Sequence, residues 1–150
     1  MWQLTIDDLD KKILEQYLNE PRQSFREIAR KLNISAGTVL NRTKRMEKEG
    51  LIKGYTAILN HEKLGYQFTA ITEVTVSNGK ILEVGDKIAK MPETCAVYNV
   101  TGLTDAMIIA KFKTRKELSD FTKTLLKIQF IERTNTHVVL NTIKENFKLL

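Results

Sequence analysis

The sequence is poor in the residues that build disulfides and metal sites. Its 150 residues include a single cysteine, Cys95, which excludes an internal disulfide framework. The only histidines are His61 and His137, so a zinc site made of cysteine and histidine would have too few ligands. We therefore expect a protein without a bound metal or cofactor, and we identify no catalytic residues.

The sequence also lacks a long hydrophobic run. No segment approaches the roughly 18 consecutive apolar residues that would mark a membrane-spanning helix. The N-terminal segment MWQLTIDDLDKK is acidic where a signal peptide would be cationic and then apolar. Hydrophobic residues nevertheless make up 42% of the chain, enough for a core in one domain or in two small ones. A cytoplasmic protein with no membrane partner is therefore expected.

Positive charge is in excess and unevenly distributed. The formal net charge is +6 and the pI is about 9.4, which favours an acidic partner. Residues 21–54 contain nine Lys or Arg and three Glu, so this segment alone carries +6. Residues 1–20 carry −3 and residues 55–150 carry +3. Such a concentration of cations is what binding to nucleic acid phosphates requires.

The segment from Ser24 to Gly50 predicts two short helices joined by a tight turn. Ser24 and Glu27 match a capping box, and apolar residues then recur at helical spacing. Ser35 can cap a second helix that ends at Gly50. Apolar and polar side chains of this second helix fall on opposite sides: Ala36, Val39, Leu40, Thr43 and Met46 on one, and Gly37, Thr38, Asn41, Lys44, Arg45 and Lys48 on the other.

The polar side of that helix is the candidate surface for reading DNA. An amide can bond an adenine edge, cations can bond guanine or phosphate, and small residues permit close approach. A merely solvated basic face is the alternative, and the localised charge argues against it. Bases would be contacted from the helix and phosphates from its flanks. The predicted DNA-binding residues are Arg22, Gln23, Ser24, Ser35, Gly37, Thr38, Asn41, Arg42, Lys44, Arg45 and Lys53.

A first helix is expected before this segment and a short strand after it. Residues 5–18 have a helical apolar stripe, with Thr5 and Asp8 as the expected capping pair. Residues 51–59, LIKGYTAIL, are rich in β-forming residues. Residues 60–65, NHEKLG, have turn character. We therefore assign residues 1–60 to a helix-turn-helix DNA-binding domain with a linking strand, and residues 66–150 to a second domain.

The second domain shows alternating strand and helix patterns. Strands are expected from Phe68 to Val76, from Thr94 to Thr101, from Ala106 to Phe112 and from Ile131 to Leu140, with helices after the first and third. This βαββαβ order predicts a ferredoxin-like fold, in which both helices cover one face of the sheet. The third strand is apolar on both sides, so a homodimer through the uncovered face is expected.

This organisation resembles the Lrp/AsnC, or feast/famine, family of transcriptional regulators. The resemblance covers essentially the whole chain, through LDKKIL, SFREIARKLNISAGTVLNRTKRMEKEGLIKGY and VTGLTDAMI with its Gly-x-x-Asp loop. It implies an α+β protein with an N-terminal winged helix-turn-helix, dimers through the C-terminal sheet, and an octamer built as a tetramer of dimers. Family loops often have an aromatic residue where Thr104 stands, and a glycine where Phe130 precedes the last strand.

The resemblance also implies a site for a small amino acid between dimers. Asp105 could pair with an α-ammonium group, and amides freed by Gly102 could bind the α-carboxylate. The loop is also explained as a β-turn in which Asp105 caps local amides, and the threonines as ordinary strand residues. The implied effector residues are Thr101, Gly102, Leu103, Thr104 and Asp105, with Thr134 and Thr136 of a neighbouring subunit.

We therefore predict a prokaryotic, nucleoid-associated transcriptional regulator whose assembly and affinity for specific DNA respond to a small amino acid. One alternative is an architectural protein that wraps DNA with little sequence preference. Another is a tetrapyrrole decarboxylase of similar architecture, which would need acid/base groups, usually including histidine, in a pocket. His61 falls in the linker, and His137 points away from Thr134 and Thr136 by strand alternation, which argues against an enzyme.

Overall fold

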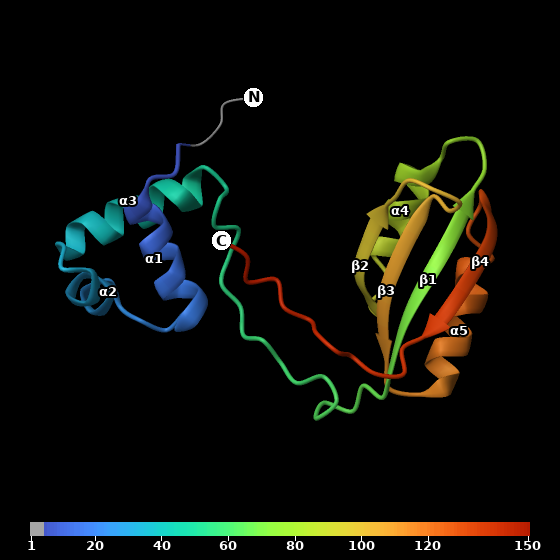
Figure 1. The fold of residues 1–150 in the computed structure, drawn as a ribbon. Coiled ribbons are helices and arrows are strands. Elements are labelled where there is room, and N and C mark those ends of the chain that lie inside the picture. Colours follow the sequence, from blue (N-terminus) through green and yellow to red (C-terminus); the bar gives the residue numbers. More distant parts are fainter. Residues whose placement is uncertain (1–4) are drawn as a thin grey trace. The chain divides into compact units, whose positions relative to one another are not determined.

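The computed structural model describes residues 5–150, and these residues form two compact units (Figure 1). One unit contains the described residues up to Ile58 together with Glu145–Leu150, and the other is Leu59–Lys144. The first unit is helical and the second is built on a sheet. The C-terminal tail thus groups with the helices, although the sequence analysis assigns it to the sheet domain.

The first helix, α1 (Asp8–Asn19), begins later than its sequence pattern suggests. The prediction that Thr5 and Asp8 cap it is wrong, because Asp7 is the N-cap. The Asp7 carboxylate accepts a hydrogen bond from the Asp10 amide at 2.8 Å, and the Asp10 carboxylate accepts one from the Asp7 amide at 3.2 Å. An aspartate accepts these bonds as well as a threonine does and adds a favourable interaction with the helix dipole.

The next two helices, α2 (Phe25–Leu32) and α3 (Ala36–Lys48), confirm the predicted helix-turn-helix. The Ser24 hydroxyl accepts a hydrogen bond from the Glu27 amide at 3.2 Å, and the Glu27 carboxylate accepts one from the Ser24 amide at 2.7 Å. After α3, Gly50 adopts the left-handed conformation (φ 73°) that ends the helix. The three helices enclose one core, whose fully or almost fully buried members are Ile13, Ile28, Ala29, Val39 and Met46.

The predicted strand in residues 51–59 is absent from the structure. This segment is extended, but it belongs to no ladder among the described residues. Its apolar side chains Tyr55, Ile58 and Leu59 are exposed. β-forming residues make a strand only beside a second strand, because the backbone groups need partners. The prediction was therefore wrong for the single chain.

The second unit contains one antiparallel sheet with the order β2-β3-β1-β4. Two helices, α4 and α5, cover one of its faces (Figure 1). The strand and helix order confirms the ferredoxin-like prediction, although the second and fourth strands each end two residues earlier than expected. The elements are β1 (Phe68–Val76), α4 (Ile81–Ala89), β2 (Thr94–Asn99), β3 (Ala106–Phe112), α5 (Arg115–Leu125) and β4 (Ile131–Val138).

The two faces of the sheet differ in burial. On β3, Ala106, Ile108, Ala110 and Phe112 are buried beneath the helices, while the residues between them are only half-buried. On β1, Ile71 and its neighbours on the same face are likewise partly exposed. The open face therefore combines apolar and polar side chains. This confirms the predicted apolar character of both sides of β3.

Phe130, immediately before β4, has a positive φ of 75°. Such a conformation is unfavourable for a bulky residue and natural for glycine. Phe130 also packs against the core of the second unit, and the Lys80 ammonium lies 5.7 Å from the centre of its ring. Packing therefore holds Phe130 in a backbone conformation that a glycine would adopt without strain.

The central residue Phe112 should contribute strongly to the stability of the second unit. Its side chain is fully buried and packs edge to face on Phe121, with 5.1 Å between ring centroids. We expect Phe112→Ala to lower the free energy of unfolding by about 3–5 kcal/mol in urea denaturation followed by circular dichroism. Leu82→Ala on α4, where the side chain is 75% exposed, is the control and should change it by less than about 0.5 kcal/mol. Equal losses from both would contradict this account of the core.

Candidate functional sites

The outward side of α3 carries small and polar residues that are open to solvent. Asn41 and Lys44 are exposed, and Val39, Thr43 and Met46 on the opposite side are buried, as the sequence predicted. Near Gly37, a Cβ atom would meet nothing closer than the Ser35 hydroxyl at 3.8 Å. The face is therefore unobstructed within the helical unit.

Ser35 and Thr38 lie at the beginning of α3 and bond to each other. The Ser35 hydroxyl caps the helix by accepting a hydrogen bond from the Thr38 amide at 3.0 Å. The two hydroxyls are 2.8 Å apart. Each hydroxyl has further hydrogen-bonding capacity, so both the cap and a contact with an outside group are possible.

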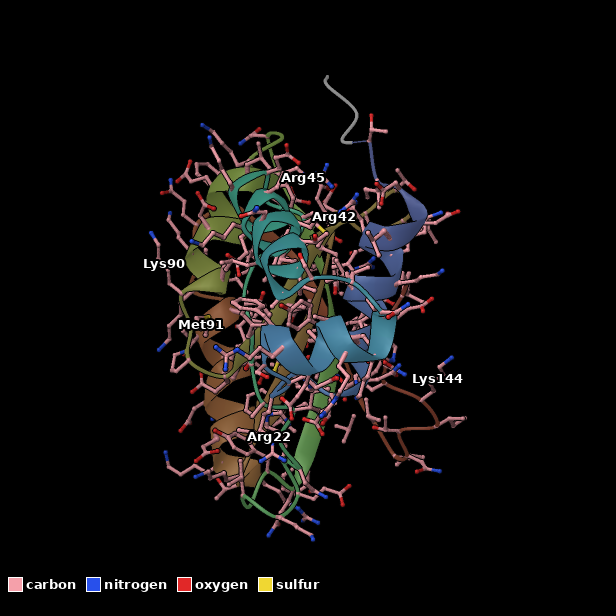
Figure 2. All side chains as sticks on the ribbon, turned by 90° about the vertical axis from the view of Figure 1, so that its left-hand side faces the viewer. Arg22, Arg42, Arg45, Lys90, Met91 and Lys144 are labelled. Carbon is pink, nitrogen blue, oxygen red and sulfur yellow. The ribbon has the colours of Figure 1, made fainter. Side chains whose placement is uncertain are left out.

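Arg42 and Arg45 both project from α3 (Figure 2). Carboxylates from the beginning of α1 and its N-cap hold them. The Arg42 Nη1 atom lies 2.6 and 2.7 Å from the two oxygens of Asp7 and 2.9 Å from Asp10 Oδ1. Arg45 Nη2 donates to Asp10 Oδ2. The side chains of Arg42 and Arg45 remain 28% and 40% exposed, whereas that of Asp10 is fully buried.

These ion pairs change the proton affinities of the groups involved. The hydrogen bond from Arg42, assisted by the amide of Asp10, lowers the pKa of Asp7 from its ordinary 3.8 to about 2. Hydrogen bonds to Asp7 and Asp10 raise the pKa of Arg42. Asp7 and Arg42 are therefore both charged at neutral pH.

The predicted phosphate-binding residues before α2 have mixed roles. Arg22 is exposed, with its Nε atom 3.6 Å from a Glu20 oxygen. The Gln23 amide nitrogen donates to the carbonyls of Gln16 and Glu20, both at 3.0 Å, and so joins α1 to α2. Ser24 caps α2. Arg22 thus offers a more accessible side chain than either of the next two residues.

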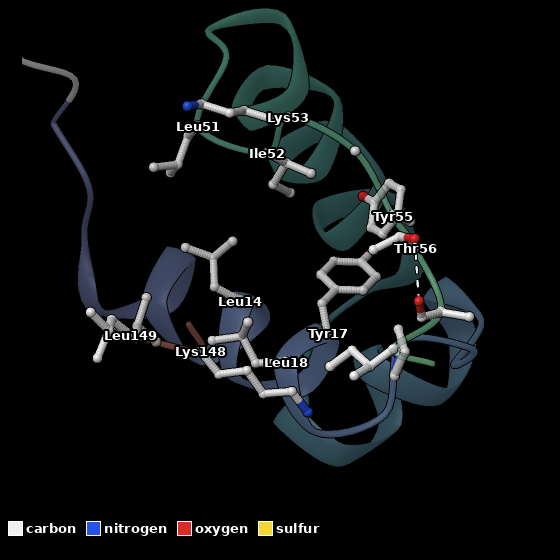
Figure 3. Close-up of a pocket in the computed structure, with 15 residues that line it drawn as sticks. Leu14, Tyr17, Leu18, Leu51, Ile52, Lys53, Tyr55, Thr56, Lys148 and Leu149 are labelled. Atoms are coloured by element: carbon white, nitrogen blue, oxygen red, sulfur yellow. Dashed lines mark hydrogen bonds between the residues drawn. The ribbon is translucent and has the colours of Figure 1, made fainter. Parts of the chain in front are cut away.

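Lys53, the remaining predicted phosphate contact, lies in the extended segment after α3. Lys53 is exposed, and it is one of the residues that line an apolar cavity of about 530 Å³ within the helical unit (Figure 3). Side chains of α1, the segment from Leu51 to Ile58 and the tail residues Lys148–Leu150 form the walls. The cavity is not predictable from local sequence patterns, because the tail residues reach it only where the two ends of the chain meet.

Two tyrosines form one wall of the cavity. The rings of Tyr17 and Tyr55 pack edge to face with 5.5 Å between centroids. The Tyr55 hydroxyl donates to a Glu47 carboxylate oxygen at 2.8 Å, and the Tyr17 hydroxyl lies 3.1 Å from that of Thr43. Burial and the bond to Glu47 raise the pKa of Tyr55. Both hydroxyls are thus neutral and tie this wall to α3.

In the second unit, the predicted effector loop is anchored at one end and open at the other. Asp105 Oδ2 accepts a hydrogen bond from the Val76 amide at 2.7 Å, and the Thr104 hydroxyl donates to the Val74 carbonyl at 2.7 Å. Gly102 has a φ of 121°, a conformation that L side chains rarely adopt. Leu103 is 98% exposed, and Thr101 is also exposed. The β-turn interpretation therefore describes the local contacts of this loop.

Thr134 and Thr136 lie on the helix-covered side of β4. Thr134 pairs with Val74 of β1, whose carbonyl also accepts the Asp105 amide at 2.9 Å, so the loop and Thr134 flank Val74 from opposite sides. The hydroxyls of Thr136 and Thr72 are 3.1 Å apart. One chain therefore brings the two predicted parts of the effector site to the same end of the sheet.

His137 occupies the opposite face, as strand alternation predicted. Its Nε2 atom lies 3.2 Å from a Glu73 oxygen and 3.1 Å from the Asn135 amide nitrogen. His61 instead packs edge to face on Tyr66, with 5.7 Å between ring centroids. Each histidine therefore has its own local partners.

Asp7 and Asp10 are the site residues that sequence reasoning missed. Their signal was present, because the acidic first twenty residues precede the basic helix-turn-helix. Within residues 5–150, the acidic, histidine and cysteine side chains form no cluster of three that could hold a metal ion. None of the helices within the same residues is long and apolar enough to cross a membrane.

A helix-turn-helix with an exposed basic face, followed by a ferredoxin-like unit, defines a DNA-binding transcriptional regulator. Residues 6–53 match the winged helix-turn-helix DNA-binding family, and residues 69–149 match the Lrp/AsnC ligand-binding domain. The chain belongs to the Lrp/AsnC family of transcriptional regulators.

Relatives cover nearly the full length of the chain. It is 46% identical to an uncharacterized HTH-type transcriptional regulator of Pyrococcus furiosus, over 97% of this chain and 99% of that protein. It also matches the structure of a Neisseria meningitidis transcriptional regulator in complex with L-Met (27% identity, TM-score 0.88, 97% of each chain). Escherichia coli AsnC is similar as well (25% identity, TM-score 0.87, 97% of this chain and 100% of that one).

The lowered pKa of Asp7 predicts an acid-sensitive contribution to stability. Because the folded pKa lies below 3.8, the pair with Arg42 stabilises the fold fully above that pH and loses its effect as pH falls toward 2. Asp10, Arg42 and Arg45 are the other charged groups of this network. Asp7→Asn preserves an N-cap acceptor while removing the charge.

We expect the stability difference between wild type and Asp7→Asn to be constant above about pH 4 and to shrink as pH falls toward 2. Urea unfolding at a series of pH values measures it. Asp8→Asn, which removes a carboxylate that is 96% exposed, is the matched control. A difference for Asp7→Asn that stays constant down to pH 2 would contradict the assigned pair.

Proposed function

We propose that this regulator binds specific DNA sequences through α3 and that a small amino acid shifts its assembly and DNA affinity. The observation that carries the proposal is the exposed polar and cationic side of α3 above a buried apolar side. Counterion release from DNA favours such a surface, and the amide and small side chains supply sequence discrimination. The protein would act in the cytoplasm, associated with the nucleoid.

The accessible side chains suggest a division of roles. We assign Thr38, Asn41 and Lys44 to base contacts and Arg22 and Lys53 to phosphate contacts. The charges of Arg42 and Arg45 are balanced by Asp7 and Asp10 while these pairs persist, so we place both arginines at the edge of the proposed surface. Ser35, Gly37, Gln23 and Ser24 complete the proposed surface by shaping the ends of the two helices.

A second copy of the chain would cover the open face of the sheet. Ile71 on β1 is partly exposed there, and Met107 and Ile109 on β3 are half-buried, so burying them on association is favourable. A two-fold dimer would also provide two copies of α3 for major grooves about 34 Å apart. Four such dimers in an octamer are the proposed higher assembly.

The loop from Thr101 to Asp105 is the proposed effector site, together with Thr134 and Thr136 of a neighbouring subunit. The complex of the Neisseria meningitidis relative with L-Met supports an amino acid as the ligand class. Asp105 would bind the α-ammonium group and exposed loop amides the α-carboxylate. A binding protein is favoured over an enzyme, because His137 and His61 each bond or pack locally rather than at this loop.

DNA selection from a random pool, with and without a mixture of amino acids, tests the proposal. A defined, enriched motif with a footprint on repeats would support a specific regulator. Protection without a motif would instead indicate an architectural protein that wraps DNA. No binding to any duplex at low salt would overturn the proposed function.

Substitutions on α3 should separate base contacts from phosphate contacts. Asn41→Ala should weaken binding to the selected sequence by about 1–3 kcal/mol and leave binding to a scrambled duplex nearly unchanged.

Lys44→Ala should relax specificity at one base position if the Lys44 side chain contacts a base, as we assign it. If Lys44 contacts a phosphate instead, the variant should lose affinity for every sequence and its salt slope should fall by about 1. Fluorescence anisotropy measures both. Lys12→Ala on α1 is a control for charge, and an effect as large as that of Lys44→Ala would mean that the wrong face is assigned.

The effector proposal is tested by Asp105→Asn. The asparagine carbonyl can still accept the Val76 amide, so the turn should be kept while the ammonium partner is lost. Wild-type protein should change its oligomer size and DNA affinity with at least one amino acid, and Asp105→Asn should not respond. Analytical ultracentrifugation and DNA titration measure the responses, with thermal unfolding as the control for folding. A normal response of the variant would remove Asp105 from the site.

A further inference from the structure

The carboxylate of Asp10 is an unusual component of a DNA-binding unit. It is fully buried, yet it lies against the helix whose outer face is proposed to meet DNA. Its oxygens accept from Arg42 at 2.9 Å, from Arg45, and from the Asp7 amide at 3.2 Å. A buried carboxylate is costly unless it is paired and hydrogen-bonded, and these contacts offset that cost.

Both charged partners of Asp10 come from α3, one helical turn apart. Arg42 and Arg45 approach it from neighbouring positions on the same side of that helix. Asp7, at the N-cap position of α1, forms an ion pair with Arg42. Two fixed guanidinium groups determine the rotation of α3 about its own axis, which a single contact would not.

The rotation of α3 decides where its outer residues point. Asn41 and Lys44 each adjoin one of the two arginines in sequence, and a turn of the helix would move all four together. Hydrogen bonds to base edges depend on direction, whereas attraction to phosphates depends little on it. A loss of rotational control would therefore affect specific binding more than non-specific binding.

We propose that Asp10, assisted by Asp7, is a positioning residue for DNA recognition, which acts by holding Arg42 and Arg45 and thereby fixing the rotation of α3. This proposal rests on the proposed DNA-binding function. Charge alone predicts a different result. An acidic residue near the DNA surface would weaken binding, and its removal would strengthen binding to every DNA sequence.

Asp10→Asn and Asp8→Asn form a matched pair for the test. Both remove one negative charge from the first turn of α1, but the Asp8 carboxylate is 96% exposed and lies 3.9 Å from Lys11 rather than against α3. Anisotropy titrations with the selected operator and with a scrambled duplex of equal length, over a series of salt concentrations, give the ratio of the two affinities. The titrations are made well below the unfolding temperature of each variant.

We expect Asp10→Asn to lose about tenfold or more in operator affinity while its affinity for the scrambled duplex stays equal or rises. Asp8→Asn should keep the wild-type ratio. Asp7→Asn, which preserves the N-cap, should lower the ratio in the same direction to a smaller extent, and it carries the test if Asp10→Asn does not fold. An unchanged ratio in the folded variants would overturn the proposal.

Hydrogen exchange without DNA provides an independent readout. Amides of α3 should exchange faster in Asp10→Asn than in Asp8→Asn, because the helix is held less firmly. Equal exchange in the two variants would overturn the positioning role even if the operator ratio changed. If neither wild type nor Asp8→Asn bound any duplex, the proposed function would be refuted instead. Faster exchange of the α3 amides in Asp10→Asn would then show that Asp10 holds the helix for a purpose other than DNA recognition.

Discussion

Two guanidinium groups one turn apart on α3 repel each other, and a buried carboxylate between them makes their arrangement stable. Asp10 belongs to another helix, so the same contact that neutralises the pair also joins α1 to α3. The apolar core formed by Ile13, Val39 and Met46 supplies most of the attraction between these helices, but apolar packing alone tolerates small rotations. Directional ion pairs at one end of the interface restrict those rotations.

The second unit uses a different solution for its two surfaces. Helices α4 and α5 bury one side of the sheet around Phe112, whereas the other side combines apolar residues with the polar group of Glu73, Asn135 and His137. A sheet face that carries both polar and apolar side chains suits a reversible association between copies of the chain. Each copy must also be stable in water when that face is uncovered. The proposed effector loop lies at an end of this sheet, where it is anchored by β1 through Thr104 and Asp105.

Local sequence patterns predicted most of this fold. The pair of Ser24 with Glu27 marks a helix start, and the structure confirms it. The same logic failed at Thr5, because Asp7 offered a competing cap two residues later. It also failed after Gly50, where β propensity found no neighbouring strand. The network of Arg42 with Asp10 was not predictable in this way, since the two residues are separated by 32 positions and each alone matches an ordinary surface residue.

The return of the C-terminal tail to the helical unit has a consequence for how the chain could be shortened. The tail residues Lys148–Leu150 line the cavity beside α1 and the segment after α3. Removing them would expose apolar side chains of α1 to water. The last residues of the chain therefore serve the helices at its beginning, although they follow the sheet in sequence.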